Sequence, residues 1–397
     1  MWFFRKNIDG VHAFYLNGLL RSLFMSMTTI FIPVYVYTLG MRSWGIVSQA
    51  ILLVVLYFVV QRILIIVIVF PLSKLIEKYG FRKSISTSVI FLLASTASFL
   101  MAEKNLNWLW ASTIFMGINI PLYWISRDSA LSQDIARGKM GSKMSYIVVL
   151  ENIAGLLGPF AGGAMVLIFG YPTLFMVAIL ILLLSIIPLW WMSPHSHKNG
   201  VSLAGFKYFL SNGRNTHQCV ANFGSALNDY GNGIIWPLIL FLQGISHEKL
   251  GGVYSLVAIV AISSQYVTGK WFDKLRSRND YADEGVYGFA AIWVGLTWIG
   301  RIFAQGIGQI IGIDLSRQIL GTVYTNFYVD YLHLGGKRMG SIAFWVYMEV
   351  IYSMGAIFIF GVMAIGVYFG IWKELTLITI SLWSLATIVM ARESNMR

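Results

Sequence analysis

The chain has 397 residues, of which 57% are hydrophobic and only 12% charged, and its mean hydropathy is +0.70. Soluble domains carry roughly 25% charged residues, so a soluble core does not account for this composition. The net charge of +12 alone would fit a nucleic-acid-binding protein, but the positions of the charges along the chain exclude that class. Cys219 is the single cysteine, which excludes an intramolecular disulfide.

Apolar runs of about 20 residues, long enough to cross a bilayer, recur along the whole chain. We expect twelve membrane-spanning helices, at 11–39, 44–72, 85–103, 107–134, 143–169, 172–192, 216–243, 249–269, 285–304, 306–333, 340–369 and 373–391. Met1–Lys6 lacks a small-residue cleavage site, so we expect no cleaved signal peptide. The sequence therefore predicts an all-α integral membrane protein without a soluble domain.

The basic residues are distributed unevenly between the two sides of these spans. With the N-terminus inside, 20 of the 29 Lys and Arg residues fall in inner segments and 4 in outer loops or helix ends, while the other five lie within spans. Basic residues gather on the cytoplasmic side of membrane proteins. We therefore expect both termini in the cytoplasm, in a cell membrane of the bacterial inner-membrane type, and no nucleic-acid partner.

Three short patterns occur twice in the chain, in the same order. They are Ser73–Lys78 with Gly269–Lys274, Pro33–Gly40 with Pro237–Gly244, and Met140–Ser142 with Met339–Ser341. The offsets of 196, 204 and 199 residues indicate a duplicated six-helix unit, a repeat type known in transporters. We expect six-helix bundles at 1–193 and 216–397, joined by a cytoplasmic hinge loop at 194–215.

Two segments resemble motifs of the major facilitator superfamily. Glu77–Lys83 is similar to its loop between spans 2 and 3, usually Gly-x-Leu-x-Asp-Arg-x-Gly-Arg-Arg, although Ser73 replaces the leading Gly and Glu77 replaces Asp. Gly155–Gly163 resembles a span 5 motif of many proton-antiporting members. The resemblance implies the major facilitator fold, two pseudo-symmetric bundles that alternate around a central cavity lined by spans 1, 4, 7 and 10.

Nine ionisable residues lie inside the predicted spans. They are Arg21, Arg62, Arg127, Asp128, Glu151, Asp229, Asp314, Arg317 and Glu349. Each charge at the bilayer centre costs roughly 3 kcal/mol on insertion scales, so most of them must face a cavity or one another.

Span 7 carries a polar stripe. Its members, three and four residues apart, are Asn222, Ser225, Asp229, Asn232 and Trp236, with Asn228 beside them. This spacing places the stripe on one helix face, which indicates a solute path, or alternatively a buried hydrogen-bond seam. Asp229 is the first candidate for a group that takes up a proton or pairs with substrate.

Span 1 carries Asn17 and Arg21 on one face, and the 204-residue offset matches Arg21 to Ser225 of the stripe. We expect Arg21 to bind an anion, with an internal ion pair as the alternative.

Span 4 carries Tyr123 one turn before Arg127. An aromatic ring and a guanidinium on one face would clamp a planar or anionic solute, with Asp128 pointing elsewhere. The alternative is a structural pair.

Five further interior charges have open roles. Asp314 and Arg317 are three residues apart, which permits either a salt bridge within the helix or solute binding by Arg317. Glu349 and Glu151 are additional candidates for proton coupling, and we expect Arg62 to be structural.

The resemblance also implies gating at the repeated charged loops, where contacts form in one state and break in another. The candidates are Lys74, Glu77, Arg82, Asp134, Arg137, Gly269, Asp273 and Lys274. The alternative is that these loops only set the topology. Small residues and a proline in span 5 predict close helix packing; they are Gly155, Gly158, Pro159, Gly162 and Gly163.

The chain has no Gly-x-x-x-x-Gly-Lys-Ser/Thr loop and no His-Glu-x-x-His motif, so we expect no enzyme activity, cofactor or metal. Our hypothesis is a monomeric secondary transporter that moves a small organic solute, anionic or amphiphilic, by alternating access coupled to protons. The alternatives are a uniporter, a lipid or lysolipid transporter, and a non-transporting receptor or scaffold on the same fold.

Overall fold

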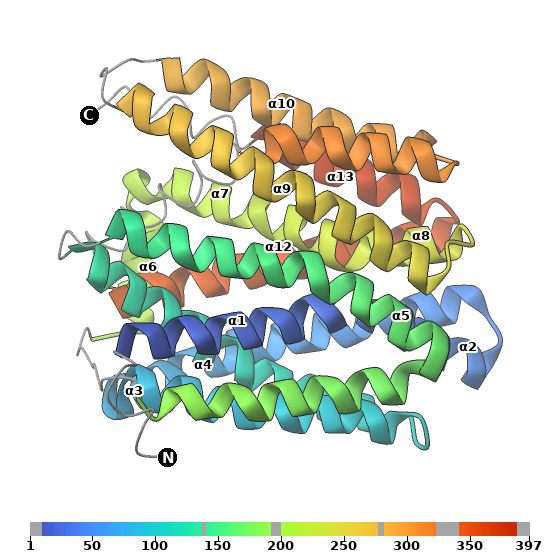
Figure 1. Ribbon diagram of the computed structural model, residues 1–397, viewed down its shortest axis with the longest axis horizontal. Coiled ribbons are helices and arrows are strands. Elements are labelled where there is room, and N and C mark those ends of the chain that lie inside the picture. Colours follow the sequence, from blue (N-terminus) through green and yellow to red (C-terminus); the bar gives the residue numbers. More distant parts are fainter. Residues whose placement is uncertain (1–9, 137–139, 192–199, 277–281, 323–340, 387–397) are drawn as a thin grey trace.

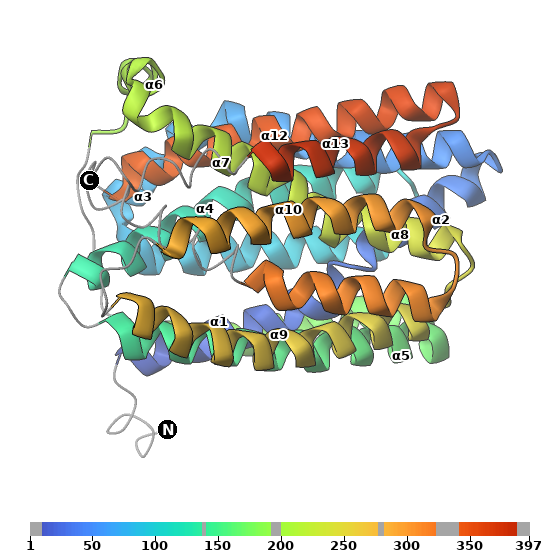
Figure 2. The ribbon, with the colours of Figure 1, turned by 90° about the horizontal axis from the view of Figure 1, so that it is seen from above.

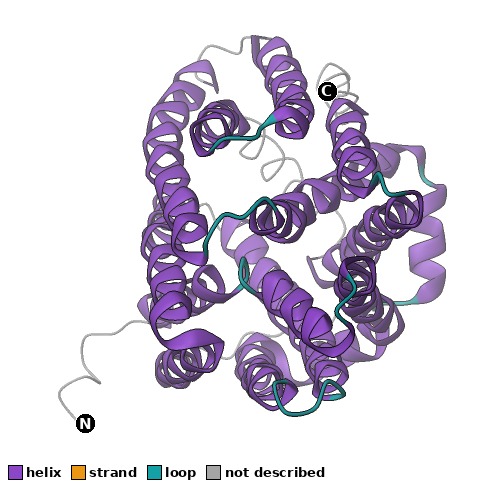
Figure 3. Cartoon of the chain, turned by 90° about the vertical axis from the view of Figure 1, so that its right-hand side faces the viewer, coloured by secondary structure: helices purple, strands orange, loops and turns teal. Residues whose placement is uncertain are grey.

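The computed structural model describes residues 10–136, 140–191, 200–276, 282–322 and 341–386. These residues form helices joined by short loops, and no strand occurs among them (Figure 3). The long helices run along one axis of the molecule (Figure 1). The end of the bundle where α1 begins is termed the near end, and the opposite end, where α2 and α8 lie, the far end.

The described residues of the N-terminal half form five helical elements. They are α1 (Gly10–Thr28), α2 (Ile32–Trp44), α3 (Val47–Ala102), α4 (Trp108–Ala136) and α5 (Met140–Leu189). Two of these are hairpins of two helices, because α3 is interrupted at Gly80 (φ 80°) and α5 at Gly170 (φ 80°). Glycine adopts positive φ without steric cost. The reversal in α3 brings Glu103, at its end, to 3.2 Å from Arg42, just before its start.

The C-terminal half begins with a short helix and contains one π-helical segment. The elements are α6 (Leu203–Ser211), α7 (Gly213–Tyr230), η2 (Gly231–Ile235), α8 (Trp236–Leu242), α9 (His247–Arg276), α10 (Ala282–Phe303), a helix at 307–322, α12 (Ser341–Phe369) and α13 (Trp372–Ala386). In the described part of the chain, four stretches are long and apolar enough to cross a membrane: Tyr15–Trp44, Val47–Ala102, Asn152–Leu189 and Ile342–Phe369. The count of twelve spans stays a prediction.

The two repeated charged segments are helical, so the prediction that they are loops is wrong. Ser73–Lys78 continues α3 up to the break at Gly80, and Gly269–Lys274 lies within α9. The reason is that Lys, Glu and Arg are good helix formers, and charge at a helix end does not by itself break the helix.

The first span of each half is irregular at the same place. α1 ends at Thr28 and α2 starts at Ile32, with Pro33 in its first turn. The π-helical residues Gly231–Ile235 lie 204 positions after 27–31, and Pro237 follows in the first turn of α8. Proline lacks the backbone donor that a regular helix needs and crowds the preceding turn. The same residue type therefore accounts for both irregularities.

The two halves pack against each other mainly through α3 with α12 and α5 with α9, and also through α4 with α12 and α2 with α8. Figure 2 shows α1, α5 and α9 lying together along one side of the bundle. In the first pair, the rings of Phe58 and Phe360 stack with centroids 5.3 Å apart. Near the other end of the same seam, Ile76 and Phe81 share an apolar core with Phe344 of α12.

Aromatic side chains also join the halves at the far end. The rings of Tyr37 and Phe241 are 6.2 Å apart, and the Tyr171 hydroxyl lies 2.8 Å from His247 Nε2. These contacts close the far end between the two halves.

The predicted hinge contains α6, which lies at the near end (Figure 1). Phe209 of α6 is fully buried, and its ring lies 5.5 Å from that of Tyr347 in α12. The Tyr347 hydroxyl donates to the Ser202 carbonyl just before the helix. The hinge is therefore a packed element over residues 200–211.

Candidate functional site

Most of the polar stripe of span 7 is hydrogen-bonded to other helices of the same half. Asn222 Nδ2 donates to the Met348 carbonyl at 2.6 Å, and Trp236 Nε1 donates to Asp314 Oδ2 at 3.0 Å. Asn228 Oδ1 accepts from a tryptophan of α10. These side chains form the hydrogen-bond seam that was the alternative to a solute path, because burial requires each polar group to find a partner.

Asp229 differs from the rest of the stripe. Its side chain is exposed to solvent although Asn228 and Tyr230 on either side are buried. Its Oδ2 accepts from the Tyr352 hydroxyl at 3.0 Å and from the Ser225 hydroxyl at 3.3 Å. Among the described residues it has no ion-pair partner. The described residues therefore leave an exposed acid without an ion-pair partner in the middle of span 7.

Arg62 of α3 connects to the C-terminal half beside this acid. Its Nη1 lies 2.8 Å from Glu349 Oε1, and its Nε donates to the Tyr230 hydroxyl. Its guanidinium also lies over the rings of Tyr230 and Tyr352, at 5.0 and 5.1 Å from their centroids. Glu349, predicted as a proton-coupling group, is therefore neutralised here by an arginine from the other half.

Asp314 pairs with a different arginine from the one that its spacing suggested. Arg301 of α10 reaches Asp314 Oδ1 with Nε at 3.0 Å and Nη2 at 2.7 Å. The Arg301 guanidinium lies between two tryptophans, 4.6 Å from Trp236 and 4.2 Å from Trp298. The alternative of a salt bridge within one helix between Asp314 and Arg317 is therefore wrong, because the planar fork of Arg301 reaches Asp314 from the neighbouring helix.

Arg301 was not predicted as part of this region, since it stands at the end of its span in the sequence. Its Nη1 also donates to Asn232 Oδ1 at 2.9 Å, and the Tyr254 hydroxyl donates to the Asn232 carbonyl at 2.6 Å. Asn232 lies in the π-helical segment η2, where the regular backbone pattern is interrupted. These contacts hold the irregular turn in place.

Arg317 is left without an acidic partner among the described residues. Its side chain is half-buried, with Cζ 5.3 Å from the centre of the Trp298 ring. Its Nε is buried and has no hydrogen-bond partner. Arg317 therefore has unused hydrogen-bonding capacity.

Arg21 lies inside the N-terminal half instead of on a solute stripe. Its Nη2 donates to Asn119 Oδ1 at 2.8 Å and its Nη1 to the Ser88 hydroxyl at 3.3 Å. Its Cζ stands 3.5 Å from the centre of the Tyr123 ring, and the residue is only 2% exposed. Neutral acceptors therefore surround this cation, and neither an acid nor solvent contacts it within the described part.

The predicted clamp of Tyr123 and Arg127 does not form, because the Tyr123 ring is occupied by Arg21. Arg127 Nη1 lies 3.3 Å from Asp128 Oδ1, so Asp128 does not point away as expected. The Arg127 guanidinium is 5.0 Å from the Trp124 ring. Span 4 thus carries the structural pair that was the alternative.

The glycines of span 5 lie at two close helix contacts. On the α1 side, Gly158 faces the side chain of Ser26, and Gly162 faces the backbone of α1, with no room for a Cβ at either position. Asn17 of α1 donates to the Ser185 carbonyl at 2.8 Å. α1 therefore packs directly on α5 both near its start, at Asn17, and near its end, at Ser26.

On the α9 side, Gly163 faces the His247 carbonyl, where a Cβ would lie at 2.5 Å. Gly251 of α9 faces the Pro159 carbonyl, and Gly155 faces α9 with ordinary contact distances. This crossing joins the two halves of the chain.

The predicted gating residues are only partly described. Lys74 is exposed, and Glu77 and Arg82 are half-buried at the end of α3. The other predicted gating residues lie outside the described side chains; they are Asp134, Arg137, Gly269, Asp273 and Lys274. The side chain of Glu151, predicted for proton coupling, also lies outside them. Their gating and coupling roles stay predictions.

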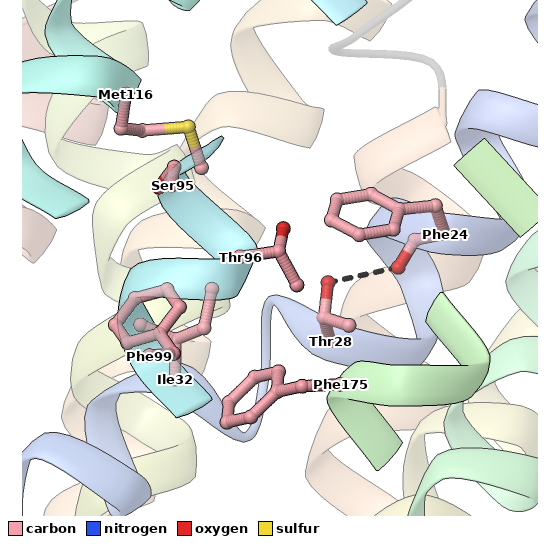
Figure 4. A pocket seen from close by; sticks show the side chains of 8 residues that line it. All are labelled: Phe24, Thr28, Ile32, Ser95, Thr96, Phe99, Met116 and Phe175. Carbon is pink, nitrogen blue, oxygen red and sulfur yellow. Dashed lines mark hydrogen bonds between the residues drawn. The ribbon is translucent and has the colours of Figure 1, made fainter. Parts of the chain in front are cut away.

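A small apolar pocket lies within the N-terminal half (Figure 4). It is lined by Phe24, Thr28, Ile32, Ser95, Thr96, Phe99, Met116 and Phe175. Its volume of about 10 Å³ is about the space of one water molecule. The pocket is therefore too small to hold an organic solute in this structure.

Three ion pairs account for most interior charges with described side chains: Arg62–Glu349, Arg127–Asp128 and Arg301–Asp314. Within the described part of the chain, the interior charges without an opposite charge in contact are Arg21, Asp229 and Arg317. Arg21 is enclosed, so the candidate site consists of Asp229 and Arg317 with the side chains around them.

Comparison with known proteins identifies the family of the chain and its fold. A family model described as Major Facilitator Superfamily matches residues 14–296. No curated protein sequence matches the chain.

Similar solved structures include the human organic anion transporter MFSD10 (TETRAN), with 12% identity, a TM-score of 0.68, and 96% of this chain and 98% of that chain covered. The E. coli fucose:proton symporter FucP has 13% identity and a TM-score of 0.63, covering 96% and 97%. The POT family transporter PepTSo has 11% identity and a TM-score of 0.63, covering 98% of both chains. At these identities the likeness shows the fold alone.

Proposed function

Since this chain belongs to the Major Facilitator Superfamily and is a secondary transporter, we propose that it moves a small organic solute by alternating access, with Asp229 carrying a coupled proton. The family supplies the fold and the transport class. The solute and the coupling are the proposed parts, and they rest on the geometry around Asp229.

The observation that carries the coupling is the state of Asp229. Asp128, Asp314 and Glu349 each pair with an arginine, whereas Asp229 contacts two hydroxyl groups and solvent. An arginine holds its partner acid in the charged form. Asp229 has no such partner among the described residues and its side chain is exposed, so we infer that a proton can reach it and leave it.

The similar structures are consistent with this proposal. FucP is a fucose:proton symporter, and MFSD10 is an organic anion transporter. We extend to this chain only the coupling to protons and the organic nature of the solute.

For orientation, we propose that the near end faces the cytoplasm. The exposed bases Lys74, Lys78 and Lys83 flank the turn of α3 at that end, which follows the tendency of basic residues to stay inside.

The test is solute flux in proteoliposomes with and without an imposed pH gradient. We expect the gradient to change flux of the wild-type protein, and Asp229→Asn to remove that response because the amide cannot exchange a proton. Asp229→Glu, which keeps the acid, should retain part of it.

Equal flux with and without the gradient in wild type would contradict proton coupling and favour a uniporter. No flux for any solute in a broad panel would favour a receptor or scaffold.

A further inference from the structure

Among the described residues of the C-terminal half, two opposite charges remain unpaired, an acid on α7 and a base on the helix at 307–322. We propose that Asp229 and Arg317 bind a zwitterionic solute, with its cationic group on the carboxylate and its anionic group on the guanidinium. This inference rests on the proposed function, because it names the class of solute that the transporter takes.

Asp229 has free capacity for a cation. A carboxylate offers about four acceptor positions. Both described hydrogen bonds, from Tyr352 and Ser225, end on Oδ2. Oδ1 accepts none from the described residues, and the side chain is exposed to solvent. An ammonium or similar group can therefore reach Oδ1 without displacing a protein partner.

Arg317 has free capacity for an anion. A guanidinium has five donors in a planar fork, and Arg317 makes no hydrogen bond or ion pair with the described residues. Its Nε is buried without a partner, which is costly for a polar group.

The ring of Trp298 lies under this guanidinium and is itself held by a hydrogen bond from Nε1 to Asn228 Oδ1 at 2.8 Å. A guanidinium next to a fixed ring has fewer orientations open to it, and its fork binds a carboxylate or phosphate with two parallel bonds.

The two groups lie on either side of one tryptophan. Trp298 Nε1 donates to Asn228, the residue before Asp229, at 2.8 Å, and the Arg317 guanidinium lies 5.3 Å from the centre of the same ring. No salt bridge joins Asp229 and Arg317 among the described pairs. An acid and a base held apart in this way can be bridged by a molecule with two opposite charges.

A solute with a single charge fits less well. An anion on Arg317 would be repelled by the charged Asp229, and a cation on Asp229 would be repelled by Arg317. The third unpaired charge, Arg21, does not change this balance, because it is enclosed by Ser88, Asn119 and Tyr123 in the other half.

The proposal has a consequence for pH. A proton and the cationic group of the solute compete for the same carboxylate, so binding should weaken as the pH falls. An anion that requires protonated Asp229 would show the opposite trend. The other titratable or charged groups around Asp229 are Tyr352, Tyr230, Arg62, Glu349 and Arg317; Arg62 and Glu349 already neutralise each other.

The experiment is a thermal-shift and calorimetric binding panel on the purified full-length protein. The probes are an α-amino acid, 4-aminobutyrate, glycine betaine and phosphocholine. Each is tested beside an anion that lacks the cationic group and an amine that lacks the anionic group. We expect at least one zwitterion to bind at least about tenfold tighter than both of its matched ions, a difference of about 1.4 kcal/mol.

Three variants complete the test. Asp229→Asn and Arg317→Gln should each remove the preference for the zwitterion, whereas Arg42→Gln, at an exposed pair on the far end, should keep it. Because a variant can fail to fold, the pH trend is also measured on the wild-type protein, where zwitterion affinity should fall as the pH is lowered from neutral to mildly acidic.

Binding of anions alone, tighter at low pH, would overturn the proposal, as would the absence of binding by every zwitterion in the panel. The outcome is separable from the coupling test. If a zwitterion binds but flux does not change with a pH gradient, the zwitterion site is supported and proton coupling is rejected. If a pH gradient drives flux of an anion instead, proton coupling is supported and the zwitterion site is rejected.

Discussion

The guanidinium of Arg62 is held by groups from two helices of the other half. Its side chain is 7% exposed and that of its partner Glu349 is 13% exposed. The pair of Arg42 and Glu103 at the far end is 61% and 36% exposed. These two pairs have the same chemistry in different surroundings, so they separate the effect of burial from the effect of charge.

We predict that Arg62→Ala lowers the free energy of unfolding by about 3–5 kcal/mol, because it leaves Glu349 enclosed without a counter-charge. Arg42→Ala should cost less than about 1 kcal/mol, since solvent screens an exposed pair. The measurement is thermal or denaturant unfolding in detergent. The double change Arg62→Met with Glu349→Met should recover most of the loss, and equal losses for the two single arginine changes would argue against this account.

At the residue scale, the sequence predicted which positions carry charge but not their partners. It marked Asp229 and Arg317 as candidates, and both have unused hydrogen-bonding capacity in the structure. It did not predict that Asp314 pairs with Arg301 or that Tyr123 stacks on Arg21. Spacing along a helix predicts which side chains share a face, but the packing of the helices determines which residues those side chains contact.

At the scale of elements, the glycines of α5 and α9 determine how closely the halves approach. Gly251 faces the Pro159 carbonyl without room for a Cβ, and a Cβ at Gly252, the next residue, would meet nothing within 4 Å. Adjacent glycines on one helix therefore have different roles.

We predict that Gly251→Ala destabilises the protein by about 1–3 kcal/mol, because an added methyl group would force two backbones apart. Gly252→Ala should be neutral or stabilising by up to about 1 kcal/mol, since alanine is the better helix former. Unfolding temperatures of the two variants check this. A larger loss for Gly252→Ala would mean that the α5–α9 contact is not the limiting one.

The duplicated proline of the first and seventh spans was visible in the sequence, but its effect was not. A broken helix at 29–31 and a π-helical turn at 231–235 are different irregularities from the same residue type. Which form occurs depends on the groups that satisfy the freed carbonyls, such as the Tyr254 hydroxyl at Asn232.

At the scale of the whole molecule, the far end is closed by contacts between the first and seventh spans. The Cβ of a residue at 233 would lie 4.0 Å from Thr29 Cγ2, so side chains at positions 29 and 233 would be in contact. The proposed alternating access requires this contact to open during each cycle.

We predict that Thr29→Cys with Gly233→Cys, in a Cys219→Ser background, forms a disulfide on oxidation and stops transport until reductant is added. Free-thiol labelling reports the bond, and proteoliposome flux reports the activity. Each single cysteine variant serves as the control. Undiminished flux in the fully cross-linked protein would show that the far end does not need to open.

The sequence by itself determined the membrane-helical class, the family and the positions of the interior charges. These depend on hydropathy, residue type and order along the chain, which are local properties. Only the tertiary structure decided which charges neutralise each other and which remain available, because nine interior charges can pair in many ways. The choice depends on which helix faces lie in direct contact, and that contact is decided by close packing at glycines and aromatic side chains.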